Sequence, residues 1–445
     1  MNYTQLTENN VRHMLDTIGV ERVDDLFRDI PPAARLERPL CLPGPLNELE
    51  LLSELNRLAG ANRTCEELVC FLGAGMYDHF IPTVVDALAG QSEFVTAYTP
   101  YQAEASQGAL QAFYEYQTLI CQLTGMDVSN ASMYEGATAA AEAVLMARAI
   151  NGRRRVAISS AVHPDVRGVL TTYLHELPIE LTVVETAGGM TNPDDLRRAV
   201  NDETSAVVIQ TPNYFGCAER LDRLSSIAHE CGAVVIAYVD PIGCGLLKPP
   251  GRLGADIVVG DGQPLGIPMS FGGPTLGFMA CRQEFMRKMP GRLVGATIDR
   301  GGRRAFCLTL QTREQHIRRE RATSNICTNQ GLLALRAAIY LSTMGRQGVA
   351  KVASLCLDKA RYAAERIASI DGFDLRFQGP FFKEFVIRTS KGVDRVVTHC
   401  RARGILAGVP LGPWYPDLAD CLLVAVTEKR TRSEIDALAD AMNDA

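Results

Sequence analysis

The central part of the chain alternates short, continuously apolar runs with amphipathic stretches. The apolar runs are rich in Val and Ile and are expected to be strands: residues 154–160, 179–186, 204–212, 233–240 and 255–261. The stretches between them have helical spacing: residues 165–177, 192–201 and 220–232. Strands that are apolar throughout and separated by helices predict a mainly parallel, doubly wound α/β domain, with both faces of the sheet covered.

The two ends of the chain follow other patterns. Residues 1–64 combine short helical stretches, one with a cap at Thr7 and a stop at Gly19, with a proline-rich connector, and we expect a helical arm. Residues 65–345 are expected to form the large α/β domain. Residues 346–445 mix helices with short strands, which predicts a small C-terminal α+β domain.

Composition and charge exclude several classes of protein. The chain has 445 residues, of which 47% are hydrophobic and 22% charged, as in ordinary globular proteins. A net charge of -6 argues against nucleic-acid binding. We expect no membrane segment and no signal peptide, hence a cytoplasmic protein. The 13 cysteines and 7 histidines have no metal-binding spacing, so no metal site is predicted.

The run at 233–240 ends in an aspartate that is a candidate for coenzyme chemistry. Ligands of open parallel sheets bind at the carboxyl ends of the strands, so Asp240 is expected to face a pocket. An aspartate at this place can pair with the protonated pyridine nitrogen of pyridoxal phosphate. The alternative is that Asp240, followed by Pro241, only turns the chain.

Long segments of the chain resemble glycine decarboxylase, the P-protein of the glycine cleavage system: residues 71–82, 92–143, 246–282 and 310–330. The resemblance covers nearly the whole chain, and the length matches subunit 1 of the two-subunit form, expected to be an α2β2 heterotetramer. It implies the fold-type-I pyridoxal-phosphate transferase fold. It also implies that, with subunit 2, the enzyme decarboxylates glycine and passes the aminomethyl group to the lipoyl arm of the H-protein. Aminomethyltransferase (T-protein) and dihydrolipoamide dehydrogenase would complete the system.

The resemblance also shows a departure from a coenzyme-binding chain. Gln263 stands where the coenzyme-bearing subunit has its Schiff-base lysine, and a glutamine amide cannot form that bond. His163 occupies a position suited to stacking on the coenzyme ring, and Asp240 remains, so we expect a degenerate pocket. Lys248 is the only lysine nearby in the sequence. The coenzyme is therefore expected on the partner subunit. The alternative is an independent pyridoxal-phosphate enzyme that uses Lys248 or another lysine that the sequence does not single out.

A polar segment after the predicted strand at residues 255–261 is a candidate for coenzyme binding across a subunit interface. In the implied fold such a segment often reaches the phosphate of the partner's coenzyme. Thr323, Ser324 and Asn325 carry the short donors that a phosphate requires. The alternative is that they form the N-terminal cap of the helix that follows.

Polar aromatic residues in a loop are candidates for lining a substrate pocket: Tyr98, Tyr101 and Gln102. Packing of the arm would explain these residues equally well. A different class of function also stays open, in which the chain is a structural or regulatory scaffold with no residue in any active site.

Overall fold

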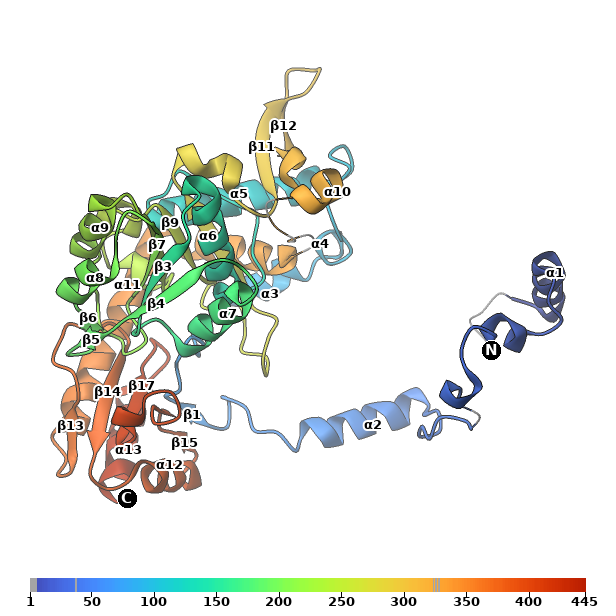
Figure 1. Ribbon diagram of the computed structural model, residues 1–445. Helices are drawn as coiled ribbons and strands as arrows, with labels where there is room; N and C mark the ends of the chain where they lie inside the picture. Colours follow the sequence, from blue (N-terminus) through green and yellow to red (C-terminus); the bar gives the residue numbers. More distant parts are fainter. Residues whose placement is uncertain (1–5, 37, 323, 325, 327–328) are drawn as a thin grey trace. The chain divides into compact units, whose positions relative to one another are not determined.

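The computed structural model describes residues 6–36, 38–322, 324, 326 and 329–445. The chain divides into two units, residues 1–63 and 64–445, and each is described by itself. The larger unit holds the central sheet and a second, smaller sheet near the C-terminus (Figure 1). In the described part of the chain, every helix is too short or too polar to cross a bilayer.

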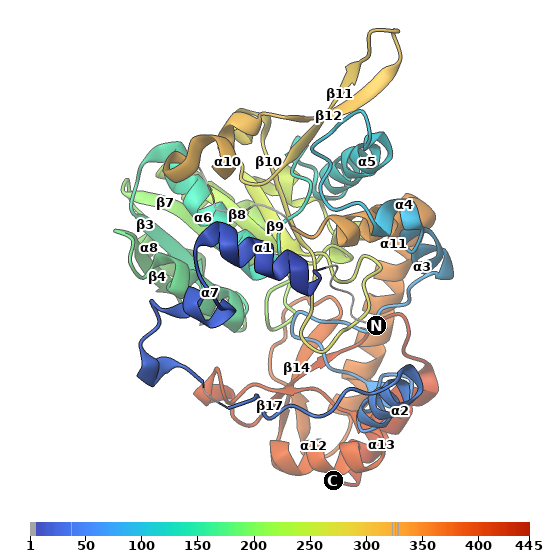
Figure 2. The same cartoon turned by 90° about the vertical axis from the view of Figure 1, so that its right-hand side faces the viewer.

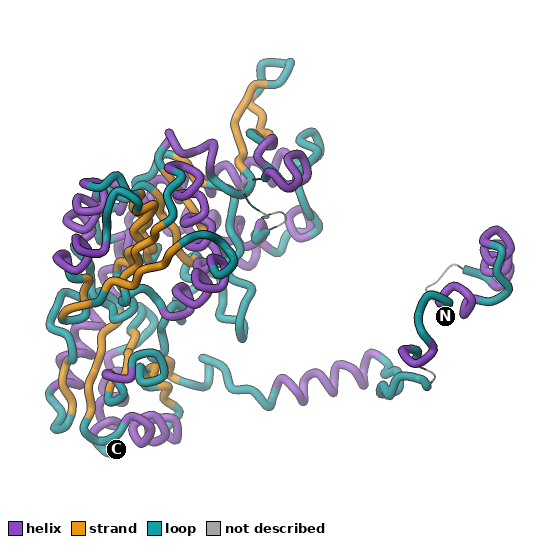
Figure 3. The backbone as a smooth tube through the Cα atoms, in the orientation of Figure 1, coloured by secondary structure: helices purple, strands orange, loops and turns teal. Residues whose placement is uncertain are grey.

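The first unit contains helices and loops but, among its described residues, no strand (Figure 3). Helix α1 (Glu8–Ile18) begins after Thr7, whose hydroxyl accepts the N–H of Asn10, and ends at Gly19 in a left-handed conformation. The predicted cap and stop are therefore confirmed. Helix α2 (Glu48–Ala59) begins with a capping box. No described residue of this unit is buried, so the unit has no core of its own.

A seven-stranded sheet forms the centre of the second unit. Its strands in spatial order are β2 (Val128–Ser129), β10 (Gly277–Cys281), β9 (Ile257–Asp261), β8 (Val234–Val239), β7 (Thr204–Thr211), β3 (Arg155–Ser159) and β4 (Glu180–Val184). Strands β9, β8, β7, β3 and β4 are parallel, whereas β10 is antiparallel to both of its neighbours. The predicted parallel sheet is confirmed, and β10 is an addition that the sequence pattern did not reveal.

Helices cover both faces of this sheet (Figure 2). Helices α6 (Gly136–Asn151) and α7 (Pro164–Leu174) pack on one face. The other face is covered by α5 (Gln107–Thr124), α8 (Pro193–Ala199), α9 (Leu221–Glu230) and the first part of α11 (Gly331–Ala368). Successive strand residues alternate between the two cores, which is why the strands are apolar throughout.

The C-terminal part contains an antiparallel sheet of β13 (Phe373–Leu375), β14 (Glu384–Thr389), β17 (Cys421–Ala425) and β16 (Val409–Pro410). The second part of α11, α12 (Val393–Ala402) and α13 (Arg432–Asn443) pack on it. A further parallel pair joins β1 (Val69–Cys70) to β15 (Ile405–Leu406), so the chain just after residue 63 pairs with the C-terminal part. Helix α11 is kinked at Gly345, which has φ +58°.

Several short elements lie outside the predicted pattern. The glycine-rich stretch after β10 forms a hairpin of β11 (Leu293–Ile298) and β12 (Arg304–Thr309). The others are α3 (Thr83–Ala89), α4 (Ser92–Val95), β5 (Thr186–Ala187), β6 (Met190–Thr191) and α10 (Gln315–Arg318). These elements connect and cover the larger ones. The consequence for function is that the carboxyl ends of β7 and β8 meet the start of β14.

Candidate functional site

A small cavity lies at the carboxyl end of the central sheet. Asp240, directly after β8, lines it together with His163. Asp240 therefore faces this cavity. The turn described by the alternative is also present, because Asp240 Oδ1 accepts the N–H groups of Ile242 and Gly243 at 2.8 and 3.2 Å.

The second oxygen of Asp240 is paired with a lysine from the C-terminal part of the chain. Lys383, directly before β14, places its Nζ 2.6 Å from Asp240 Oδ2, and its side chain is only 1% exposed. Lys248, the lysine nearest to this region in the sequence, is exposed, whereas the fold brings the distant Lys383 to the aspartate. Burial works to raise the pKa of Asp240, but the Lys383 ammonium outweighs it and holds the pKa below its usual value.

A buried hydrogen-bonded chain continues from Lys383. Its Nζ lies 3.1 Å from His79 Nε2, and His79 Nδ1 lies 2.6 Å from Glu428 Oε2. Burial and the neighbouring Lys383 lower the pKa of His79, so we assign a neutral ring that accepts from Lys383 and donates to Glu428. The carboxylates of Asp240 and Glu428 are thus linked through the Lys383 ammonium and the His79 imidazole.

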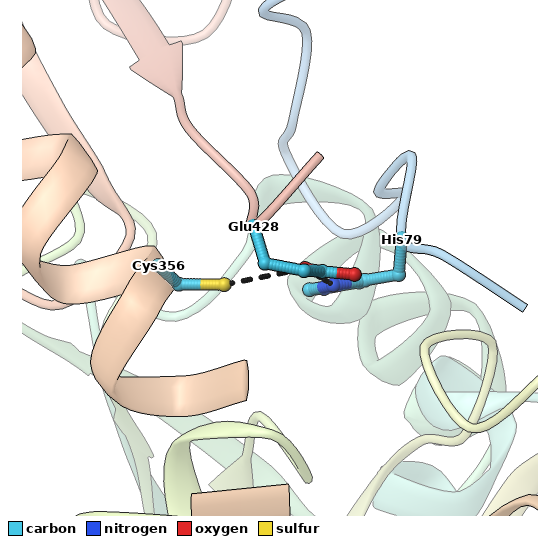
Figure 4. A group of neighbouring side chains, drawn as sticks. All are labelled: His79, Cys356 and Glu428. Carbon is cyan, nitrogen blue, oxygen red and sulfur yellow. Dashed lines mark hydrogen bonds and ion pairs between the residues drawn. The ribbon is translucent and has the colours of Figure 1, made fainter. Parts of the chain in front are cut away.

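Cys356 on α11 lies at the end of this chain, next to His79 and Glu428 (Figure 4). The ligand atoms of the three residues lie within 4.8 Å of one another, a grouping that sequence spacing did not reveal. The thiol donates to Glu428 Oε2 over 3.5 Å, and burial raises the pKa of Cys356. Because the thiol is protonated and the carboxylate is already hydrogen-bonded, the three side chains satisfy one another, and we assign no metal to them.

Gln263, which is expected to stand in place of the Schiff-base lysine, is buried and fixes a neighbouring loop. Its Oε1 accepts the N–H of Tyr77 at 3.0 Å, and its Nε2 donates to the carbonyl of Tyr77 at 3.0 Å. Nε2 also donates to the carbonyl of Ile267 at 2.9 Å. The amide therefore uses both its donor and its acceptor to hold the loop of residues 73–79 in the cavity wall.

The same loop contacts His163. The ring Nε2 of His163 lies 2.9 Å from the carbonyl of Ala74, and its Nδ1 accepts the N–H of Asp165, so Nε2 is the protonated nitrogen. Ala74 has φ +55° and is followed by Gly75 at φ +98°, so this stretch forms a tight turn. The ring of His163, the residue expected to stack on a coenzyme, thus lies next to the backbone of Gly75.

Glu384, the first residue of β14, is a buried carboxyl group of this cavity. Its Oε1 accepts the N–H of Ala74 at 2.7 Å, and its Oε2 accepts the hydroxyl of Tyr77 at 2.8 Å. Burial raises the pKa of Glu384 to about 7, although these hydrogen bonds and Lys383 oppose the rise. The pKa of this carboxyl group therefore lies close to neutral pH.

The residues of this cavity do not fit pyridoxal phosphate. The cavity measures about 30 Å³, which is room for only a few water molecules, at roughly 10–15 Å³ each. Ligand pockets are typically about 300–1,000 Å³. Gln263 cannot form a Schiff base, and the carboxylate that would face the pyridinium is already paired with Lys383. No step of a reaction is assigned to a coenzyme in this cavity.

A second region brings together candidates that are far apart in the sequence. Tyr98 is 83% exposed and lines a groove of about 290 Å³ with Asn329, which lies two residues before the start of α11. Tyr101 accepts a hydrogen bond from Arg292 Nη2 at 3.0 Å, and Arg292, which is buried, lines an adjoining cavity with Tyr98 and Asn329. Gln102 is exposed beside them in sequence. The aromatic loop and Asn329 therefore meet in one place.

Of the polar segment itself, Ser324 is described, whereas Thr323 and Asn325 lie outside the described residues. The hydroxyl of Ser324 accepts the N–H of Ile326 at 3.1 Å and hydrogen-bonds to Glu142 on α6, which is largely buried. Helix α11 begins at Gly331 with Gln330 at its N-cap. Ser324 is thus not the cap of this helix, which weakens the capping alternative for that residue.

Sequence reasoning missed the residues that fill the first cavity: Tyr77, His79, Lys383, Glu384 and Glu428. One signal was present. Lys383 and Glu384 interrupt an otherwise apolar strand-like stretch, and adjacent charges on a strand point to opposite faces, so at least one must be buried in a covered sheet.

The fold and the aspartate at the end of β8 define the class of the chain, a fold-type-I pyridoxal-phosphate transferase fold. Two solved structures of low identity share the fold: a sphingosine-1-phosphate lyase from Burkholderia pseudomallei (17% identity, TM-score 0.69, 93% of this chain and 94% of that one) and a NifS-like protein from Rickettsia africae (12%, TM-score 0.63, 85% and 100%).

The chain belongs to the glycine cleavage system P-protein family, whose model matches residues 1–442. It is 52% identical over 439 residues to a probable glycine dehydrogenase (decarboxylating) subunit 1 of Desulforamulus reducens, covering 99% of this chain and 98% of that one. The corresponding protein of Geotalea uraniireducens is 50% identical over the whole of both chains. A crystal structure of glycine decarboxylase (P-protein), in inhibitor-bound form, has TM-score 0.90 and 44% identity over the whole of both chains.

Proposed function

We propose that this chain is the non-coenzyme subunit of a two-subunit glycine decarboxylase. With subunit 2 it decarboxylates glycine by means of pyridoxal phosphate and transfers the aminomethyl group to the lipoyl arm of the H-protein, next to the T-protein and dihydrolipoamide dehydrogenase in the same cytoplasmic system. The observation that carries the proposal is the end-to-end similarity to chains named subunit 1. The filled cavity around Lys383 supports placing the coenzyme on the partner.

The segment Thr323–Asn325 supplies hydrogen-bond donors to the phosphate of the partner's coenzyme. Support comes from the chain that follows the segment: Asn329 lines a groove with Tyr98, and Arg292, a buried cation, lines the adjoining cavity with both. A surface that holds aromatic rings, a side-chain amide and a guanidinium next to one another has the chemistry of a site for an anionic, partly aromatic ligand. Tyr98, Tyr101 and Gln102 then line the substrate side of that site.

Coenzyme titration of the assembled pair tests this role. Charge-assisted hydrogen bonds contribute about 1.5–3 kcal/mol, so Thr323→Ala or Ser324→Ala is expected to raise the half-maximal pyridoxal phosphate concentration by roughly tenfold or more. The matched control is Ser226→Ala, whose hydroxyl bonds within its own helix. Unchanged coenzyme affinity in both loop variants would contradict the role in trans. Borohydride reduction and mass spectrometry of the same samples report the coenzyme's location; a pyridoxyl-lysine in this chain would contradict the assignment to the partner.

The second candidate function is a scaffold that contributes no residue to an active site. It is favoured by the closed state of the Asp240 cavity, which leaves this chain without a coenzyme site of its own. The two functions differ in the glycine–bicarbonate exchange of the reconstituted pair. Loop variants that assemble normally and retain full exchange at every coenzyme concentration identify the scaffold.

A further inference from the structure

The candidate coenzyme residues of this chain are each engaged by another part of the same chain. Asp240 is paired with Lys383, at 2.6 Å. His163 contacts the carbonyl of Ala74, and Gln263 holds the backbone of Tyr77 through both its amide groups. A pocket that had only lost its anchor would keep these groups available. The cavity is instead filled from within.

The surroundings of Lys383 Nζ are those of a binding site for an organic ammonium ion. The nitrogen lies 2.6 Å from Asp240 Oδ2, 3.1 Å from His79 Nε2 and 3.4 Å from the centre of the Tyr77 ring. A carboxylate, a neutral imidazole acceptor and the face of an aromatic ring are the three kinds of partner that stabilise a desolvated ammonium. Nearly complete burial means that water replaces none of them.

The partners of the ammonium are themselves held by the fold. Asp240 is fixed by the N–H groups of Ile242 and Gly243, and His79 by Glu428. Tyr77 is fixed through its backbone by Gln263 and through its hydroxyl by Glu384. The site is thus organised independently of Lys383, which enters it from the start of β14.

We propose that the cavity is an alkylammonium-binding site permanently occupied by Lys383, which stands opposite Asp240 where a coenzyme would place its pyridinium. The chain therefore closes its own coenzyme pocket with a built-in cation, and the closure does not depend on the absence of the Schiff-base lysine alone. The inference concerns this chain's own cavity and stands apart from the proposed role of the Thr323–Asn325 segment.

Chemical rescue of the full-length chain tests the proposal. Lys383→Ala removes the side chain beyond Cβ, and propylammonium has the same atoms as the part removed. We expect the variant to melt at a lower temperature than the wild type. Millimolar propylammonium is expected to raise the melting temperature again by about 2–4 °C or more, with saturation. Propanol, which has the same length without the charge, is expected to give no saturable rise.

Two further variants identify the site of the effect. Lys351→Ala, which removes an exposed lysine of α11, is expected to melt like the wild type and to show no rescue. Asp240→Asn combined with Lys383→Ala is expected to lose the response to propylammonium, because the carboxylate that attracts the ion is gone. A response that persists in the double variant overturns the proposal, as does a rise that is equal in the wild type and in Lys383→Ala.

If Lys383→Ala does not fold, a double variant tests the proposal instead. Asp240→Asn with Lys383→Met removes both charges while keeping the volume of the long side chain, and is expected to restore soluble, folded chain. Such recovery shows that the unpaired carboxylate caused the failure and supports the site. If the double variant is as insoluble as Lys383→Ala, the pairing of Lys383 with Asp240 is not what holds the cavity, and the proposal is wrong.

Discussion

The buried carboxyl group of Glu384 makes the stability of the chain depend on pH. Its pKa is raised from the ordinary value of 4.5 to about 7 by burial, so the folded chain keeps a proton that the unfolded chain releases. The stabilisation from this group is fully present below pH 4.5 and is lost as the pH rises through about 7. One pKa unit corresponds to about 1.4 kcal/mol, so the loss amounts to about 3 kcal/mol.

Glu384→Gln removes this titration and keeps the shape of the side chain. The amide oxygen can still accept from Ala74, and the amide nitrogen can donate to the Tyr77 hydroxyl. We expect the free energy of unfolding of the variant, relative to the wild type, to increase by about 3 kcal/mol between pH 5 and pH 8. Other groups such as Asp261, whose pKa burial raises to about 6, act equally in both proteins and cancel in the difference.

Urea unfolding of both proteins at intervals from pH 5 to pH 8 measures this difference. Glu365→Gln is the matched control, because Glu365 is an exposed carboxylate of α11 in the same part of the chain. Its difference from the wild type is expected to stay constant with pH. A difference for Glu384→Gln that is also constant, or that changes in the opposite direction, refutes the argument that burial dominates this carboxyl group.

Two further predictions concern packing and assembly. Gly216 has φ +82°, and an added Cβ would lie 1.9 Å from the carbonyl oxygen of Glu384, so Gly216→Ala is expected to destabilise the chain by at least about 2 kcal/mol in urea unfolding. Gly168→Ala, in the open surface of α7, is the control and should be neutral or stabilising. The double variant Leu49→Ser, Leu52→Ser, on the exposed face of α2, should leave the melting temperature unchanged but reduce co-purification with the partner subunit. A clear drop in melting temperature would show that these leucines pack within this chain instead.

The sheet and its helices were predictable because their signal is local. Strands buried on both faces are apolar at every position, and the stretches between them have helical spacing, so the runs that end at Asp240 and Asp261 were found from the sequence. Strand β10 (Gly277–Cys281) escaped because it follows a glycine-rich turn and has no β-branched residue. The β11–β12 hairpin escaped because its pattern resembles a glycine-rich loop.

The cavity was predictable only in part, because the information is divided between segments. The place of Asp240 follows from the topology of parallel sheets, and the loss of the anchor is visible at Gln263. The ion pair with Lys383 depends on the approach of β14 to the end of β8, a contact between remote segments that no local pattern encodes. The same holds for the meeting of Tyr98 with Asn329, which lie in different predicted elements.

Asp240 shows why an aspartate at this position is not by itself a sign of a bound coenzyme. A buried carboxylate without a partner is costly, since breaking a buried ion pair typically costs about 3–5 kcal/mol. A chain without coenzyme must therefore replace the aspartate, protonate it or supply another cation. The pKa of Asp240 lies below its usual value, which excludes protonation, and Lys383 supplies the cation. The proposal therefore depends on a pair of residues, Gln263 and Lys383, because a glutamine amide cannot form a Schiff base and the Lys383 ammonium pairs with the Asp240 carboxylate.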